Sequence, residues 1–174
     1  MAHAQETKFV PLNIAVLTLS DTRTEATDTS GKVLVTGLQN AGHTLVDKKI
    51  VADNIYHIRA VVSAWIASEK IEVIISTGGT GVTGRDCTPE ALKPLFDREI
   101  DGFGEVFRAY SMEEIGTSTV QSRAIAGTAN STYIFCLPGS TGACRTGWDR
   151  ILQPQLDITT RPCNFAILIP RLKE

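Results

Sequence analysis

The sequence predicts an α/β protein with a mostly parallel sheet that helices cover on both faces. Short apolar runs rich in Val and Ile alternate with longer segments whose apolar residues recur at helical spacing. This alternation is typical of parallel strands joined by helical crossovers. The chain has 174 residues, 43% hydrophobic and 21% charged, an ordinary globular composition. We therefore expect a single domain, residues 1–174, with a substantial core.

The first half of the chain is predicted to alternate between strands and helices. A buried strand is expected at Asn13–Leu19, and further strands are expected at Thr44–Val51 and residues 71–77. Asp28, Thr29 and Ser30 offer side-chain oxygens that can cap the first helix, and Gly42 can end it. Asn54 is expected to cap the second helix, whose apolar residues form one amphipathic face.

The second half departs from this alternation. Helices are predicted over residues 91–99, 105–115, 120–126 and 143–152, with Pro94 kinking or shortening the first of them. A buried strand is predicted at Thr132–Leu137 and a short final strand at residues 164–169. Three helices would therefore follow one another between the third and fourth strands.

A glycine-rich loop after the third strand is the most informative stretch for function. Gly78, Gly79 and Gly81 lack a Cβ, so their main-chain N–H groups can approach an anion closely, and Thr80 adds a hydroxyl. Further along the loop, Arg85 supplies a cation and Asp86 a possible Mg²⁺ ligand. Together these residues predict a site for a phosphorylated ligand.

Simpler interpretations of the same loop stay open or fail. The glycines can form only a tight turn, with Thr88 as an N-cap and Pro89 and Glu90 in the first helical turn, but this does not explain Arg85 and Asp86. A dinucleotide fingerprint, G-x-G-x-x-G, is matched formally, yet Pro89 places the helix start too late for it. A phosphate-binding P-loop is excluded because no Gly-Lys-Ser/Thr closes the loop.

Polar residues also follow the other predicted strands. Ser20 and Asp21 come after the first strand, Asp53 after the second, and Pro138, Gly139 and Ser140 after the fourth. In a parallel sheet the loops that follow strands meet at one edge, where ligands bind. If the second strand is parallel to the others, these loops and the glycine loop form one site.

Charge and cysteine usage exclude several classes of function. A net charge of -2 gives no electrostatic reason to expect nucleic acid as a partner. The four cysteines form no C-x-x-C pair, so we expect free thiols and no zinc site. No apolar run approaches membrane-spanning length, and we expect a cytoplasmic protein with no membrane partner.

Short motifs spread over nearly the whole chain form a specific set: Ser20-Asp21, Asp28-Thr29-Ser30-Gly31, Thr77 to Gly81, Asp86 with Thr88-Pro89-Glu90, Gly102-Phe103-Gly104-Glu105, and Leu137-Pro138-Gly139. At these residues the chain resembles the molybdenum cofactor biosynthesis family of the MoaB and MogA proteins and the gephyrin G domain, with the MoaB branch the most similar.

The resemblance implies a three-layer α/β/α sandwich of the MogA type, assembled as a homotrimer or a dimer of trimers. It implies binding of molybdopterin and adenylylation of its terminal phosphate with ATP and Mg²⁺, which releases pyrophosphate. Contacts with other cofactor-biosynthesis proteins are also compatible with the resemblance. A non-catalytic molybdopterin-binding scaffold or carrier is the alternative, because the branch includes members without the activity.

The resemblance assigns roles to residues of the predicted site. Asp53 and Asp86 would be catalytic and would hold the metal. The remaining family positions would bind the substrate: Ser20, Asp21, Ser30, Gly78, Gly79, Thr80, Gly81, Arg85, Glu105, Ser111, Pro138, Gly139 and Ser140.

Overall fold

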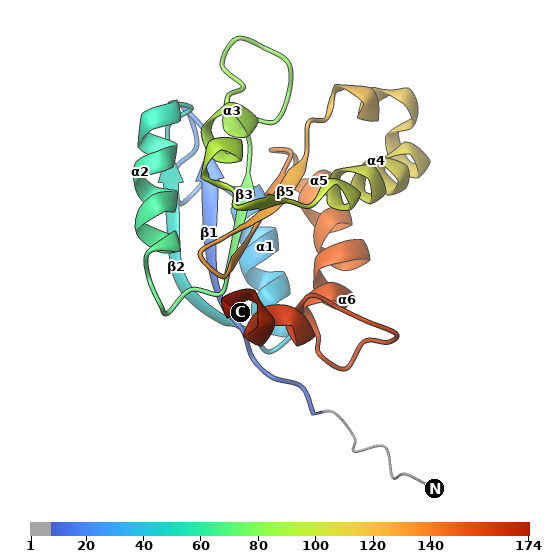
Figure 1. Cartoon of the computed structure of the whole chain (residues 1–174). Helices are drawn as coiled ribbons and strands as arrows, with labels where there is room; N and C mark the ends of the chain where they lie inside the picture. Colours follow the sequence, from blue (N-terminus) through green and yellow to red (C-terminus); the bar gives the residue numbers. More distant parts are fainter. Residues whose placement is uncertain (1–7) are drawn as a thin grey trace, which may run out of the picture.

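A computed structural model describes residues 8–174, so the first seven residues of the predicted domain lie outside the described residues. The described chain forms one six-stranded sheet with strand order β2-β1-β3-β6-β5-β4 (Figure 1). The strands are β1 (Asn13–Leu19), β2 (Thr44–Val51), β3 (Val73–Thr77), β4 (Arg98–Glu99), β5 (Ile125–Ala129) and β6 (Thr132–Leu137). Neighbouring strands among β2, β1, β3 and β6 are parallel. β5 pairs antiparallel with β6, and β4 pairs antiparallel with β5. The expected mostly parallel sheet is therefore confirmed.

Helices cover both faces of this sheet. They are α1 (Thr29–Asn40), α2 (Ile55–Ile66), α3 (Thr88–Leu92), α4 (Asp101–Ile115), α5 (Thr141–Gly147) and α6 (Gln153–Leu156). Short 3₁₀ segments span Lys93–Leu95, Gly116–Gln121 and Ala166–Lys173, and a π-helical stretch, Trp148–Leu152, joins α5 to α6.

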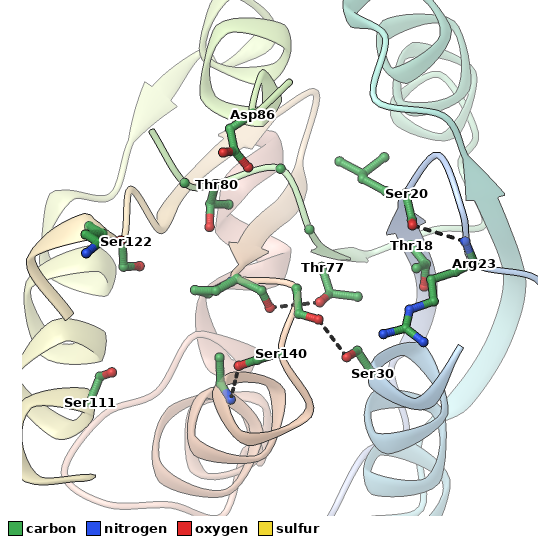
Figure 2. A pocket seen from close by; sticks show the side chains of 18 of the residues that line it. Thr18, Ser20, Arg23, Ser30, Thr77, Thr80, Asp86, Ser111, Ser122 and Ser140 are labelled. Atoms are coloured by element: carbon green, nitrogen blue, oxygen red, sulfur yellow. Dashed lines mark hydrogen bonds between the residues drawn. The ribbon is translucent and has the colours of Figure 1, made fainter. Parts of the chain in front are cut away.

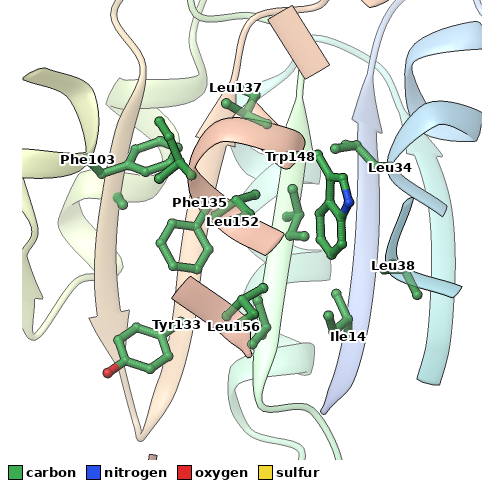
Figure 3. Close-up of a cluster of buried hydrophobic side chains, with 14 of the residues drawn as sticks. Ile14, Leu34, Leu38, Phe103, Tyr133, Phe135, Leu137, Trp148, Leu152 and Leu156 are labelled. Carbon is green, nitrogen blue, oxygen red and sulfur yellow. The ribbon is translucent and has the colours of Figure 1, made fainter. Parts of the chain in front are cut away.

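Two buried clusters show how alternating side chains divide between the faces. Val16 and Phe135 join Leu34 of α1 and Trp148 in one cluster, which also includes α4 and α6 residues (Figure 3). Their strand neighbours point the other way: Leu17 packs in a second cluster with apolar residues of α2 and α3. The result is the three-layer α/β/α sandwich that was expected.

The N-terminal caps of the first two helices agree with the sequence predictions, and for α1 they identify which of three candidate residues is the cap. Asp28 caps α1 by accepting from the Gly31 N–H at 2.8 Å, so it is Asp28, of the three candidates, that caps the helix. Asn54 caps α2, as predicted. The predicted cap of α3 is wrong: α3 already includes Thr88, whose buried hydroxyl donates instead to the Gly78 carbonyl at 2.8 Å.

Three predictions for the second half are wrong. Residues 91–99 are helical only to Leu92; a 3₁₀ turn and the edge strand β4 follow. Residues 120–126 end a 3₁₀ segment and enter β5, because a two-residue turn with positive φ at Asn130 and Ser131 folds β5 back on β6. Residues 164–169 are not a strand, since the Asn164 side chain accepts from the Ile167 N–H at 2.8 Å and supports a 3₁₀ turn.

Candidate functional site

A cavity of about 560 Å³ opens at the carboxyl ends of β1, β3 and β6. The loops that follow these strands line it, together with the 3₁₀ segment after α4 (Figure 2). The structure therefore brings together most of the predicted substrate-binding residues. They are Ser20, Ser30, residues 78–81, Ser111 and residues 138–140, and the predicted metal ligand Asp86 lines the same cavity.

The glycine loop has a shape that only glycine can adopt. Gly78 has φ +110° and Gly79 has φ +62°, values that L side chains rarely take. A Cβ on Gly78 would lie 2.2 Å from the Leu19 carbonyl oxygen, and a Cβ on Gly79 would lie 2.4 Å from the Thr88 hydroxyl. The close approach of the loop to β1 and to α3 thus requires both glycines, and both line the cavity.

Hydroxyl groups tie the loop after β6 to the rest of the site. The Ser30 hydroxyl donates to the Gly139 carbonyl at 2.9 Å, and the Thr77 hydroxyl donates to the Pro138 carbonyl at 2.9 Å. Ser140 caps α5 by accepting from the Ala143 N–H at 3.1 Å (Figure 2). These bonds hold the β6 loop in one arrangement beside the glycine loop, so the cavity wall is preorganised.

Arg23 is a site residue that sequence reasoning missed. It is the only basic side chain among the described residues that line the cavity, and Figure 2 shows it extending into the pocket between Ser20 and Ser30. Its guanidinium donates to the Thr27 carbonyl at 3.2 Å. Its place three residues after Ser20, in a loop that follows a strand, was the available signal.

Arg85, a predicted substrate-binding residue, is not among the residues that line this cavity. It forms a forked ion pair with Asp21, with nitrogen–oxygen distances of 2.6–2.9 Å. The hydrogen bonds and charge of Arg85 hold the pKa of Asp21 below its ordinary value. Asp21 also accepts from the Asp53 N–H at 3.1 Å, so this pair joins the loops after β1 and β2 to the glycine loop.

The two predicted metal ligands differ in environment. Asp53 Oδ1 is buried without a hydrogen-bond partner, beside Gly79. Burial, and then the nearby charge of Asp21, raise the pKa of Asp53. The carboxylate of Asp86 accepts from the N–H and the hydroxyl of Thr83, at 2.8 and 2.5 Å. Burial alone would raise the pKa of Asp86, but these bonds outweigh it and the net shift is downward.

These carboxylates fit a divalent cation that takes part of its coordination from a substrate. Within residues 8–174 there is no cluster of three or more His, Cys, Asp or Glu side chains that could enclose a metal. Mg²⁺ is commonly held by one or two carboxylates together with substrate phosphates and water. An unpartnered buried oxygen on Asp53 and an ionised Asp86 match that requirement.

Glu105 is separated from the other predicted residues. It lines a second cavity, of about 720 Å³, between α3, α4 and β5. Ser122 lines both cavities, so the segment that joins α4 to β5 forms the partition between them. A ligand confined to the first cavity would not reach Glu105 unless it extended past this segment.

Comparison with known proteins identifies the family of the chain. Residues 15–158 match the family model described as a probable molybdopterin binding domain. Molybdenum cofactor biosynthesis protein B of Escherichia coli strain K12 is 61% identical over 168 residues, which cover 97% of each chain. The protein of the same name from Bacillus subtilis strain 168 is 40% identical over 155 residues, 88% of this chain and 91% of the relative.

Solved structures agree. A crystal structure of molybdenum cofactor biosynthesis protein B has a TM-score of 0.82 and 43% identity over 84% of this chain and 92% of the other. The tungsten cofactor synthesizing protein MoaB from Pyrococcus furiosus has a TM-score of 0.74 and 35% identity over 94% and 98%. A MogA structure has a TM-score of 0.67 and 30% identity over 78% and 89%. The chain therefore belongs to the MoaB/MogA family of molybdenum cofactor biosynthesis proteins.

Proposed function

We propose that this protein binds molybdopterin in the first cavity and adenylylates its terminal phosphate with ATP. The observation that carries the proposal is the glycine loop, which lines that cavity and has Asp53 beside Gly79 and Asp86 beside Gly81. Backbone N–H groups suited to phosphate thus lie next to carboxylates suited to Mg²⁺. The family match supports the pterin as ligand.

In the proposed reaction an ionised oxygen of the pterin phosphate attacks the α-phosphorus of ATP. A new phosphorus–oxygen bond forms, the bond from the α-phosphorus to the bridging oxygen breaks, and pyrophosphate leaves. The attacking oxygen carries no proton at neutral pH, so no general base is needed. The protein must mainly align two polyanions and offset their repulsion.

Side chains of this chain divide that work. Arg23 is suited to contact the phosphate of the pterin, and Ser20, Ser111 and Ser140 offer hydroxyls along the same cavity. Arg85 stays a predicted phosphate contact, although it already binds Asp21. Asp53 and Asp86 would hold Mg²⁺, which when bound neutralises charge on the phosphates of ATP.

A non-catalytic carrier is the second candidate. It is favoured by the position of the pocket, whose lining includes Asp86 but neither Asp53 nor the Arg85–Asp21 pair, so the pterin could bind without ATP. The purified protein should be incubated with molybdopterin, ATP and Mg²⁺. Adenylylated pterin and an equal amount of pyrophosphate are expected. Bound molybdopterin with no adenylylated product would instead establish the carrier.

Assembly and location extend the proposal. Within the described residues, exposed apolar side chains concentrate on α4 and the 3₁₀ segment after it: Val106, Met112, Ile115 and Val120. Such a surface is suited to burial against another copy, in keeping with a trimer or a dimer of trimers.

No helix of residues 8–174 is long and apolar enough to cross a membrane. We place the protein in the cytoplasm together with the pathway it serves.

A further inference from the structure

Arg123 has a position that the predicted site does not account for. It follows the partition residue Ser122 and precedes β5, on the side of the second cavity. Its side chain nevertheless reaches the glycine loop of the first cavity. Its Nε donates to the Gly81 carbonyl at 2.7 Å, and an Nη donates to the Asp86 carbonyl at 3.1 Å.

Two more bonds fix Arg123 itself. Its backbone N–H donates to the Thr80 carbonyl at 2.9 Å, and its second Nη forms an ion pair with Glu90 of α3. The guanidinium is a rigid planar fork with several donors, so its bonds form together and cost little side-chain entropy for each. One arginine therefore holds both ends of loop 81–86 and joins them to the start of α3.

The loop between those ends is closed on itself. The Asp86 N–H donates to the Thr83 carbonyl at 3.1 Å, and the Thr83 N–H donates to the Asp86 carboxylate at 2.8 Å. Arg85 also ties the loop to Asp21, but both partners are exposed, and exposed ion pairs contribute little. Fixing residues 81 and 86 thus fixes the direction of the Asp86 carboxylate.

We infer that Arg123 is a positioning residue, which holds loop 81–86 so that Asp86 stays in the lining of the first cavity. The inference deepens the proposed function and rests on it for its catalytic meaning, because Asp86 is there a ligand of Mg²⁺. The hold on the loop itself is a property of the protein without ligands and can be measured without turnover.

A matched control comes from Arg59 of α2. It uses the same chemistry on the far end of α3, donating to the Ala91 carbonyl at 3.0 Å and the Glu90 carbonyl at 2.9 Å. It makes no hydrogen bond to residues 81–86. Arg59→Lys should therefore lower stability as Arg123→Lys does, but leave the loop unchanged. Glu90→Gln keeps an acceptor for Arg123 and should also leave the loop protected.

The test combines hydrogen exchange of the free protein with turnover. In Arg123→Lys the hydrogen-bonded amides of Thr83 and Asp86 should exchange about tenfold to a hundredfold faster, the effect of losing charge-assisted bonds. The Mg²⁺ concentration for half-maximal adenylylation should rise by a similar factor, with the KM for molybdopterin changed less than threefold. Arg59→Lys and Glu90→Gln should show neither change, and melting temperatures confirm that each variant is folded.

Unchanged loop exchange in folded Arg123→Lys would overturn the inference. So would faster exchange with a Mg²⁺ dependence equal to that of Arg59→Lys, since Arg123 would then be structural only. A wild-type protein that makes no adenylylated pterin would overturn the proposed function. In that event, loop exchange that differs between Arg123→Lys and Arg59→Lys still supports the hold of Arg123 on Asp86.

Discussion

Arg23→Ala should weaken molybdopterin binding more than any other single charge removal in the cavity. Arg23 is the only basic side chain among the described lining residues, and no acidic partner neutralises it within residues 8–174. A charge-assisted hydrogen bond contributes about 1.5–3 kcal/mol, so its loss should raise Kd roughly tenfold to 150-fold. Arg23 is exposed, and within residues 8–174 its side chain donates only to the Thr27 carbonyl, so its removal should leave the fold intact.

The matched comparison is Arg85→Ala. The charge of Arg85 is already compensated by Asp21, so its removal should raise Kd by about fivefold or less. Isothermal titration calorimetry at fixed ionic strength would give both values. If Arg85→Ala had the larger effect, or if Arg23→Ala bound as tightly as the wild type, the assignment of Arg23 to the phosphate would be refuted.

Three further predictions concern stability and assembly. Gly78→Ala should destabilise the protein by about 3 kcal/mol or more, because φ is +110° and the new methyl group would lie 2.2 Å from the Leu19 carbonyl oxygen. Chemical denaturation would measure the free energy of unfolding, and Gly102→Ala, where a Cβ meets no atom within 4 Å, is the control. Burial opposes ionisation of Asp28, but its bonds from Gly31, Lys48 and Thr18 outweigh this and lower its pKa below the ordinary 3.8. The contribution of Asp28 to the free energy of unfolding is therefore complete above about pH 4 and is lost as pH falls through the lower pKa of the folded state. Asp28→Asn should make the free energy of unfolding less dependent on pH in this acidic range. Sedimentation should find an oligomer at micromolar concentration, and a monomer there would contradict the proposed assembly.

The sheet and its binding edge were predictable because the local sequence patterns of this region, apolar runs and helix caps, match the structure that the tertiary packing requires. Asn13–Leu19 and Thr44–Val51 match the strands residue for residue. Asn13–Leu19 was identifiable because a buried parallel strand is a continuous apolar run, whereas Thr44–Val51 is an edge strand with no fully buried residue. Asn54 was identifiable because an Asn before an amphipathic run satisfies free N–H groups at the helix start. The parallel β2 then places Asp53 at the same edge as the glycine loop.

The second half was less predictable because its structure depends on long-range contacts. Residues 120–126 have no strong periodicity of their own, and it is pairing with β6 that makes part of them a strand. The pairing of Arg85 with Asp21 spans 64 residues, and that of Arg123 with Gly81 spans 42, so neither leaves a local pattern in the sequence. Arg23 carried a local signal, its place after Ser20, but nothing there shows which arginine faces the cavity.

Asp86→Asn is the decisive variant for the proposed adenylylation. Asparagine has nearly the same shape but no charge, and Asp86 is not the cap of α3, so the fold and the cavity should be retained. Mg²⁺ prefers ionised oxygen ligands, and loss of such charge stabilisation should lower kcat by about two to three decades. The control is Asp149→Asn, which changes an exposed carboxylate of the Trp148–Leu152 segment, outside the first cavity.

The measurement is the rate of adenylylated molybdopterin formation with Mg²⁺ and ATP, together with the Kd for molybdopterin of each variant. We expect the wild type and Asp149→Asn to be active, Asp86→Asn to be nearly inactive, and the Kd for molybdopterin to differ less than threefold among them. Equal rates for Asp86→Asn and wild type would contradict the metal role of Asp86. A wild type that binds molybdopterin and never adenylylates it would contradict the proposed activity.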